Sequence, residues 1–274
     1  MIPRAVSDIT IKVKDLYHLS DKEISSIKTV IDRCNMALYQ SETNDPEDKS
    51  AVLRLGEQLG LTHIDRNLLS GDDSISVIKN TSERTAQDFI PYTRRSMNWH
   101  TDGYYNTSDR TIRGMILHCA SSAQDGGETL LYDPELIYLF MMDKNPDLVS
   151  ALMEEDVLCI PEYRENNGVI RNKVSGSVFN TDSDGFLNMR YTERKKYVLW
   201  KKDKTVDEAI RFITQLLNED SRYHVRVRLK PGEGVVCNNV VHRRNAFVDG
   251  EDSQRVLYRA RYYDRIMPPS LNMT

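Results

Sequence analysis

The stretch TIRGMILHCA, residues 111–120, gives the clearest indication of how this chain folds. It is short and rich in the residue types that are common in β-strands. Similar runs recur from residue 74 onward, among them ETLLY at 128–132 and RVLYRARYY at 255–263. Many short strands of this kind predict a β-sandwich or a barrel.

The first third of the chain has helical periodicity instead. Residues 21–40 place apolar side chains at helical spacing after Ser20, and Glu23 completes a capping box. A second helix is expected over residues 47–59, because Gly60 is a common stop signal. The N-terminal region is therefore expected to be α-rich.

Two helical segments interrupt the strand-rich part and are expected to pack on the outer faces of the sheets. They are residues 134–155, split around Asn145-Pro146, and residues 205–219. No linker separates the two parts of the chain. We therefore expect a single domain over residues 1–274, in which the α-rich region 1–73 packs on a core formed by 74–274. The predicted fold is mainly β with α, a double-stranded β-helix (distorted jelly roll) with flanking helices.

The composition of the 274 residues excludes several classes of protein. A net charge of −4 and a pI near 5.9 argue against binding nucleic acid by bulk electrostatics. No apolar run approaches the roughly 18 residues that a membrane span needs. The four cysteines are scattered without a C-x-x-C pair, so neither a zinc knuckle nor a disulfide framework is indicated. A cytoplasmic protein without a membrane partner is expected.

Two H-x-D triplets could each contribute to a metal site. They are His63 to Asp65 and His100 to Asp102. In a strand, residues i and i+2 point to the same face, so either triplet could present an imidazole and a carboxylate to one metal ion. A 2-His-1-carboxylate site for non-haem iron leaves further positions open, and it needs one more histidine from elsewhere in the chain.

His242 is the best candidate for that third ligand. It follows the short apolar run GVVCNN, residues 234–239, and precedes an arginine-rich terminal strand. His118 is less suitable, because it lies within a strand where alternation favours a buried core histidine that is satisfied by hydrogen bonds.

Four motifs in order resemble the taurine dioxygenase and 2,4-D dioxygenase (TauD/TfdA) family. They are WHTD at 99–102, GGET at 126–129, the distal His242, and RVLYR at 255–259. The family pattern is W-H-x-D, G-G-[DE]-T, a distal His and R-x-x-x-R. The resemblance covers roughly residues 90–265, and it selects His100 over His63.

Matched residue by residue, the resemblance implies a set of metal ligands and a set of cosubstrate contacts. The ligands of Fe(II) would be His100, Asp102 and His242. The distal carboxylate of 2-oxoglutarate would be held by Thr129 and Arg259, with Arg255 assisting. A guanidinium matches a carboxylate bidentately, and a threonine hydroxyl adds a neutral donor.

The reaction implied by the resemblance couples decarboxylation of 2-oxoglutarate, with O2, to hydroxylation of a substrate C–H bond, and releases succinate and CO2. The substrate is expected to be a small polar molecule. Tyr104, Tyr105 and Arg190 are candidate contacts, and they suit an amino acid or a sulfonate. Tyrosines also suit a betaine, through cation-π attraction.

Two other classes of protein remain as alternatives. The same ligands could serve a metalloenzyme, or a metal-binding β-sandwich, that does not use 2-oxoglutarate. A non-catalytic binding domain is the third reading, against which the complete ligand set counts. The family resemblance also makes a homo-oligomer a reasonable expectation.

Overall fold

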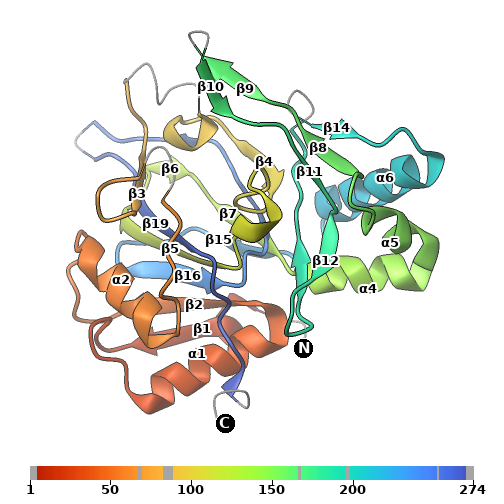
Figure 1. Cartoon of the computed structure of the whole chain (residues 1–274). Helices are drawn as coiled ribbons and strands as arrows, with labels where there is room; N and C mark the ends of the chain where they lie inside the picture. Colours follow the sequence, from red (N-terminus) through yellow and green to blue (C-terminus); the bar gives the residue numbers. More distant parts are fainter. Residues whose placement is uncertain are drawn as a thin grey trace. The chain divides into compact units, whose positions relative to one another are not determined.

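The computed structural model describes residues 5–66, 70–82, 89–165, 168–194, 198–251 and 253–269 (Figure 1). The chain divides into two compact units. Unit 1 comprises Met1–Met97, Ile112–Leu131 and Arg222–Thr274, and unit 2 comprises Asn98–Thr111 and Tyr132–Ser221. The expected single domain over residues 1–274 stays a prediction.

A six-stranded sheet is the main element of unit 1. In spatial order its strands are β1 (Thr10–Val13), β2 (Met36–Ser41), β16 (Glu233–Cys237), β5 (Gly114–Ser121), β19 (Val256–Tyr262) and β3 (Ser76–Lys79). β1 and β2 run parallel, and every other neighbouring pair in this sheet is antiparallel. The stretch 111–120, which we took as the guide to the fold, therefore contributes a central strand.

A four-stranded sheet has the order β15 (Val225–Val227), β7 (Thr129–Tyr132), β17 (Val241–Arg244) and β4 (Met97–His100). A short pair, β18 (Phe247–Val248) with β6 (Asp125–Gly126), extends the strand-rich part. Leu131 and Val225 pack in one buried cluster with Met115, Leu117 and Val235 of the six-stranded sheet. Strands of the two sheets thus share an apolar core inside unit 1.

Helices α1 (Asp21–Cys34) and α2 (Lys49–Gln58) pack on the six-stranded sheet. Ile27 and Leu55, which have no exposed surface, belong to the same buried cluster as Ile116. The predicted capping box of α1 is confirmed, since the Ser20 hydroxyl accepts from the Glu23 amide and the Glu23 carboxylate accepts from the Ser20 amide. The N-terminal helices and their buried faces could be predicted from the sequence, because caps and hydrophobic periodicity are local signals.

The prediction of one helix over residues 21–40 is wrong beyond residue 34. Asn35 adopts a left-handed conformation, with φ 58°, and ends the helix. The next residues form β2, in which Leu38 and Tyr39 face different core clusters. A short apolar run is compatible with both helical and strand periodicity. Here the pairing with β1 and β16 makes it a strand.

Among its described residues, unit 2 contains α-helices and short strands. The helices are α4 (Pro134–Lys144), α5 (Pro146–Leu152) and α6 (Lys204–Asn218), which confirms both helical insertions. Asn145 ends α4, and its side chain caps α5. The strands are β8 (Leu158–Ile160), β9 (Tyr163–Glu165), β10 (Gly168–Arg171), β11 (Val174–Gly176), β12 (Phe179–Thr181), β13 (Leu187–Met189) and β14 (Leu199–Trp200).

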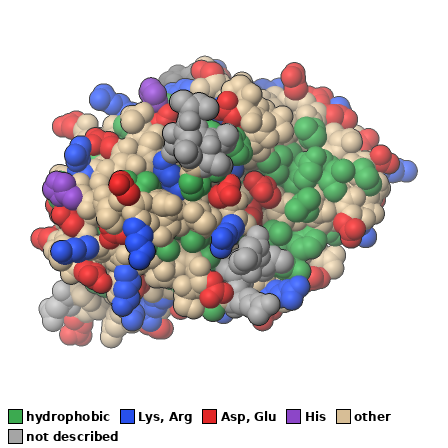
Figure 2. Space-filling view, turned by 90° about the horizontal axis from the view of Figure 1, so that it is seen from below, with side chains coloured by type: hydrophobic (Ala, Val, Ile, Leu, Met, Phe, Trp, Pro, Cys, Tyr) green, Lys and Arg blue, Asp and Glu red, His purple; other side chains and the backbone are tan. Residues whose placement is uncertain are grey.

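Helix α4 leaves part of its apolar surface uncovered. Leu139 is 58% exposed and Met142 is 37% exposed. Figure 2 shows hydrophobic side chains gathered on the right of the face seen from below, the side on which α4 lies in Figure 1. The expected homo-oligomer stays a prediction. No helix among the described residues is long and apolar enough to cross a membrane.

Candidate active site

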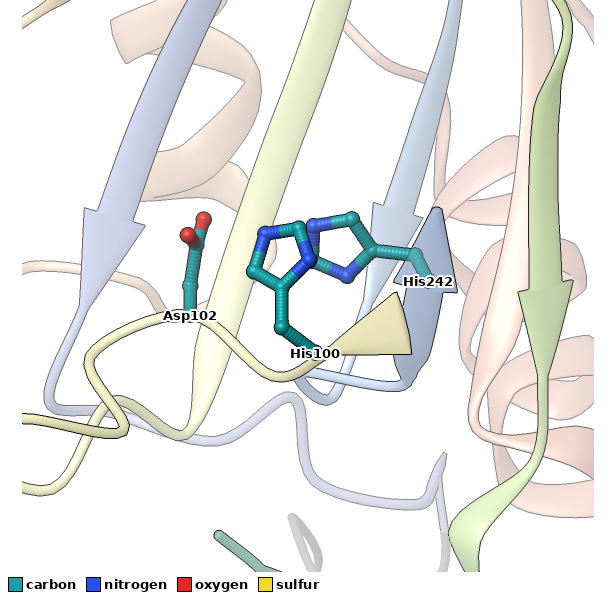
Figure 3. A group of neighbouring side chains, drawn as sticks. All are labelled: His100, Asp102 and His242. Atoms are coloured by element: carbon teal, nitrogen blue, oxygen red, sulfur yellow. The ribbon is translucent and has the colours of Figure 1, made fainter. Parts of the chain in front are cut away.

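The structure brings together the three residues that the motifs predicted as metal ligands. His100 is the last residue of β4, Asp102 follows two positions later, and His242 lies in β17, the neighbour of β4 in the four-stranded sheet. One donor atom from each side chain lies within 4.8 Å of the other two, and all three residues are buried (Figure 3). This donor set is that of a 2-His-1-carboxylate site.

Backbone hydrogen bonds orient both imidazole rings. Nδ1 of His100 lies 2.9 Å from the carbonyl oxygen of Asn98, and Nδ1 of His242 lies 2.9 Å from the carbonyl oxygen of Val240. A carbonyl oxygen only accepts, so each Nδ1 carries the proton and donates. Each Nε2 therefore keeps its lone pair for a metal ion. The residues present fit a divalent iron ion.

The rival triplet is engaged in other contacts. His63 is exposed, and its Nδ1 lies 2.7 Å from the carboxylate of Asp264. Asp65 is buried in an ion pair with Arg261 and also accepts from the hydroxyl of Tyr263 at 2.5 Å. His63 is thus a surface residue that is paired with Asp264.

His118 is a buried core histidine, as the alternation in its strand suggested. Its Nδ1 lies 2.8 Å from the hydroxyl of Tyr39, and its Nε2 lies 3.0 Å from the carbonyl oxygen of Pro46. Burial lowers the pKa of His118 below its ordinary value. The ring is therefore neutral, donates from Nε2 and accepts the Tyr39 hydroxyl at Nδ1.

The GGET segment lies against Arg255. Thr129 is the first residue of β7 and is buried. Gly127, with φ 77°, could not carry a side chain easily, because a Cβ there would lie 3.1 Å from Nε of Arg255. The Arg255 guanidinium also lies over the ring of Phe247, 4.9 Å from its centroid. The absence of a side chain at Gly127 thus lets the guanidinium of Arg255 lie close to the backbone of the GGET segment.

Arg255 is a buried cation with unused hydrogen-bonding capacity. It is 4% exposed, and its Nη1 is buried without a hydrogen-bond partner among the described residues. Burial lowers its pKa to about 10, so it remains charged at neutral pH. Its neighbour Arg244 donates to the carbonyl oxygens of Pro91 and Thr93. An anion brought to Arg255 would supply the missing partner.

Arg259, the second arginine of the R-x-x-x-R motif, lies within β19. It is buried, and its register partners are Leu117 in β5 and Ser76 in β3. Strand alternation directs Arg259 to the same face of the sheet as Leu257, whereas Arg255 lies just before the first residue of β19. That face contributes Leu257 to the core shared with the four-stranded sheet.

The three predicted substrate contacts belong to one cluster in unit 2. Tyr104 and Tyr105 follow Asp102 after one glycine, and their ring centroids are 5.2 Å apart. Nε of Arg190 donates to the backbone oxygen of Tyr104 at 2.5 Å. Sequence reasoning missed Arg171, whose guanidinium lies 5.6 Å from the centroid of the Tyr105 ring. Its place at the end of β10 carried no motif that could have identified it.

A sheet-rich fold with two histidines and a carboxylate converging on one point defines the class of non-haem iron oxygenases. The chain belongs to the taurine catabolism dioxygenase TauD, TfdA family, whose model matches residues 4–261. The family resemblance that the four motifs indicated is therefore confirmed. The cluster of His100, Asp102 and His242 fits the iron site of such oxygenases.

Comparison with known proteins agrees with this assignment. The chain is 30% identical over 169 residues to uridine-5'-phosphate dioxygenase of Amycolatopsis sp, a match that covers 60% of this chain and 60% of that protein. The match thus spans about three fifths of the length of this curated relative.

Solved structures share the fold at low sequence identity. Asparagine oxygenase in complex with Fe(II), 3-hydroxyasparagine and succinate matches with a TM-score of 0.65 and 14% identity, over 88% of this chain and 78% of that chain. A taurine dioxygenase from Burkholderia xenovorans matches with a TM-score of 0.63 and 15% identity, over 96% of this chain and 90% of that chain. The mixed α/β, sheet-rich fold is thus that of known oxygenases.

Proposed function

We propose that this protein is an Fe(II)- and 2-oxoglutarate-dependent dioxygenase that hydroxylates a C–H bond of a small polar substrate and releases succinate and CO2. The observation that carries the proposal is the cluster of His100, Asp102 and His242, in which the Nδ1 atoms of both imidazoles are held by backbone carbonyls and Nε2 is left for a metal ion. These three residues would hold Fe(II), which with 2-oxoglutarate and O2 supplies the oxidising chemistry. The protein supplies the binding and orientation of the reacting carbon.

The distal carboxylate of 2-oxoglutarate would be held by Thr129 together with Arg255 and Arg259. The surroundings of Arg255 support a direct role, because its buried Nη1 has no partner among the described residues and it lies beside the GGET turn. The buried hydroxyl of Thr129 would add a neutral donor. The family resemblance gives Arg259 the main contact with this carboxylate and Arg255 an assisting role. The two arginines therefore require separate tests.

The fold proposed for this site is the distorted jelly roll. The apolar core shared by strands of the two sheets in unit 1, and the antiparallel pairing of most strands, support it. The single TauD/TfdA-like domain over residues 1–274 is part of the same proposal.

The substrate proposed from sequence is an amino acid, a sulfonate or a betaine-like molecule that contacts Tyr104, Tyr105 and Arg190. The cationic side chain of Arg190 favours a substrate with an anionic group rather than one with the quaternary ammonium of a betaine. The name of the Amycolatopsis relative adds uridine-5'-phosphate to the candidates, and the asparagine oxygenase structure adds asparagine. These compounds, with taurine, form the first panel to test.

The reaction class is tested without any substrate. Fe(II) and 2-oxoglutarate are added anaerobically to the purified protein, and the visible charge-transfer band of the metal–cosubstrate complex is recorded. His100→Ala should abolish the band. His63→Ala is the matched control, because it removes the histidine of the other H-x-D triplet, and it should leave the band intact.

Two results would contradict the proposal. A band that persists in His100→Ala would remove this histidine from the ligand set. Bound iron without any band in the wild type would favour the alternative metalloenzyme that does not use 2-oxoglutarate, against which the family match counts. With the band established, succinate release in the presence of each panel compound identifies the substrate.

A further inference from the structure

Two guanidinium groups in unit 2 lie against the same pair of tyrosines. Nε of Arg190 donates to the backbone oxygen of Tyr104 at 2.5 Å, and the guanidinium of Arg171 lies 5.6 Å from the centre of the Tyr105 ring. Tyr105 is three residues from Asp102, so their Cα atoms are at most roughly 11 Å apart. The two cations therefore gather at a segment that begins at a proposed metal ligand.

In the part of the chain that the structure describes, neither of these arginines is paired with an acidic side chain. Among the described residues, no ion pair joins Arg171 or Arg190 to a carboxylate. Burial, together with the positive charge of Arg171, lowers the pKa of Arg190 to about 10. Burial also lowers the pKa of Arg171, and Arg194 adds repulsion. Positive charge that is partly removed from water without a counterion is costly, and an anion would offset that cost.

Both side chains keep donors that no group satisfies. Nη2 of Arg190 and Nε of Arg171 are buried without a hydrogen-bond partner in the part of the chain that the structure describes. Nη2 of Arg171 is fixed by the carbonyl oxygen of Pro161 at 2.8 Å. Each guanidinium is thus anchored through one of its nitrogens and has another that is free to donate to a ligand.

The backbone leaves room for one of these guanidinium groups. Gly176, the last residue of β11, lies so close to Arg190 that a Cβ at this position would come within 2.5 Å of Nη1. Any other residue would push the guanidinium away from its place against Tyr104. The position of Arg190 therefore depends on glycine at residue 176, in addition to the hydrogen bond to Tyr104.

We propose that Arg171 and Arg190, beside Tyr104 and Tyr105, form a binding subsite for a phosphate monoester group of the substrate. A phosphate monoester carries a charge of about −1.5 to −2 at pH 7 and three acceptor oxygens, so it matches two unpaired cations better than a carboxylate or a sulfonate does. The inference rests on the proposed function in one respect, namely that this cluster contacts the substrate. It extends that function by naming the chemical class of the group bound.

The test compares three ligands that share a phenyl ring. Phenyl phosphate, benzenesulfonate and benzoate are titrated by calorimetry, under anaerobic conditions, into protein loaded with Fe(II) and 2-oxoglutarate. Phenyl phosphate should bind most tightly to the wild type. Arg171→Gln and Arg190→Gln should each raise its dissociation constant about tenfold or more, because each removes a charged donor.

Matched variants separate the subsite from general effects of charge. Arg164→Gln removes an exposed arginine of β9 that is paired with Glu162, and it should leave the dissociation constant unchanged. Gly176→Ala should weaken phenyl phosphate binding by displacing Arg190. Arg190→Lys retains the charge, so it should recover part of the affinity that is lost in Arg190→Gln.

The outcomes distinguish this inference from the proposed function. Equal binding of phenyl phosphate by the wild type, Arg171→Gln and Arg190→Gln would overturn the subsite, and so would benzenesulfonate or benzoate binding as tightly as phenyl phosphate. The charge-transfer band, recorded on the same samples, reports the proposed function independently. A missing band with intact phosphate binding would overturn the reaction class and leave the subsite standing.

Discussion

Replacing Arg255 with methionine tests how 2-oxoglutarate is anchored. The substitution keeps an unbranched side chain of similar length and removes the buried guanidinium, which is 4% exposed and has a free Nη1. A hydrogen bond to a charged group contributes about 2 kcal/mol when it replaces water. Losing one such bond should raise the dissociation constant of 2-oxoglutarate about 30-fold.

The assay is an anaerobic titration of 2-oxoglutarate into the Fe(II)-loaded protein, followed by the charge-transfer band. Arg94→Met is the matched control, because Arg94 is exposed and pairs with Asp249 in the same region. It should bind 2-oxoglutarate as the wild type does, because the Arg94 side chain is exposed, unlike the buried Arg255. Arg259→Met is titrated alongside.

One pattern of affinities would refute the reasoning about Arg255. If Arg255→Met binds 2-oxoglutarate normally and Arg259→Met does not, the carboxylate is held by Arg259 alone. The free Nη1 of Arg255 would then have another explanation. Equal losses in both variants would support a shared role for the two arginines. The thermal unfolding midpoint of each variant must be recorded, so that a loss of fold is not read as a loss of affinity.

Three further predictions concern stability. Ser20→Ala removes the hydroxyl that caps α1 and should lower the free energy of unfolding by about 1 kcal/mol in urea denaturation, whereas no loss would mean that the cap is unimportant. Leu55→Ala should cost about 3 kcal/mol in the same assay, because this fully buried side chain would leave a cavity, and a cost below about 1 kcal/mol would contradict the packing described. Burial lowers the pKa of His118 below its ordinary value of 6.5. As the pH falls below about 6.5, His118 is protonated in the unfolded chain before it is protonated in the folded chain. The free energy of unfolding should therefore decrease in this pH range. His118→Gln should reduce this decrease, measured by denaturation at about pH 7.5 and about pH 5.5, and an unchanged decrease would show that other groups cause it.

The parts of the fold that sequence predicted are those governed by local signals. The start of α1 at Ser20, the break between α4 and α5 at Asn145, and the strands β5 and β19 were all expected near their observed positions. Caps, turns and hydrophobic periodicity act over a few residues, so they can be read without the tertiary structure. The strand β2 was missed because its conformation depends on pairing with β1 and β16, which lie elsewhere in the sequence.

The residues of the candidate site also fall into those that the sequence predicted and those that it did not. Sequence proposed His100 and Asp102 from their spacing and from the WHTD motif, and it named His242 from the order of the motifs. Sequence did not name Arg171, because a lone arginine at the end of a short strand has no distinguishing pattern. Nor could sequence tell that His63, in an equally good triplet, is engaged by Asp264.

The sequence by itself determined the family, the start of α1, several of the strands, and the short segments that carry the metal ligands. Only the tertiary structure decided which distant residues meet: His242 with the H-x-D triplet, Arg255 with Gly127, and Arg171 with Tyr105. The physical reason is that spacing within a segment is fixed by backbone geometry, whereas contacts between distant segments depend on strand pairing and on how the chain returns to the sheet.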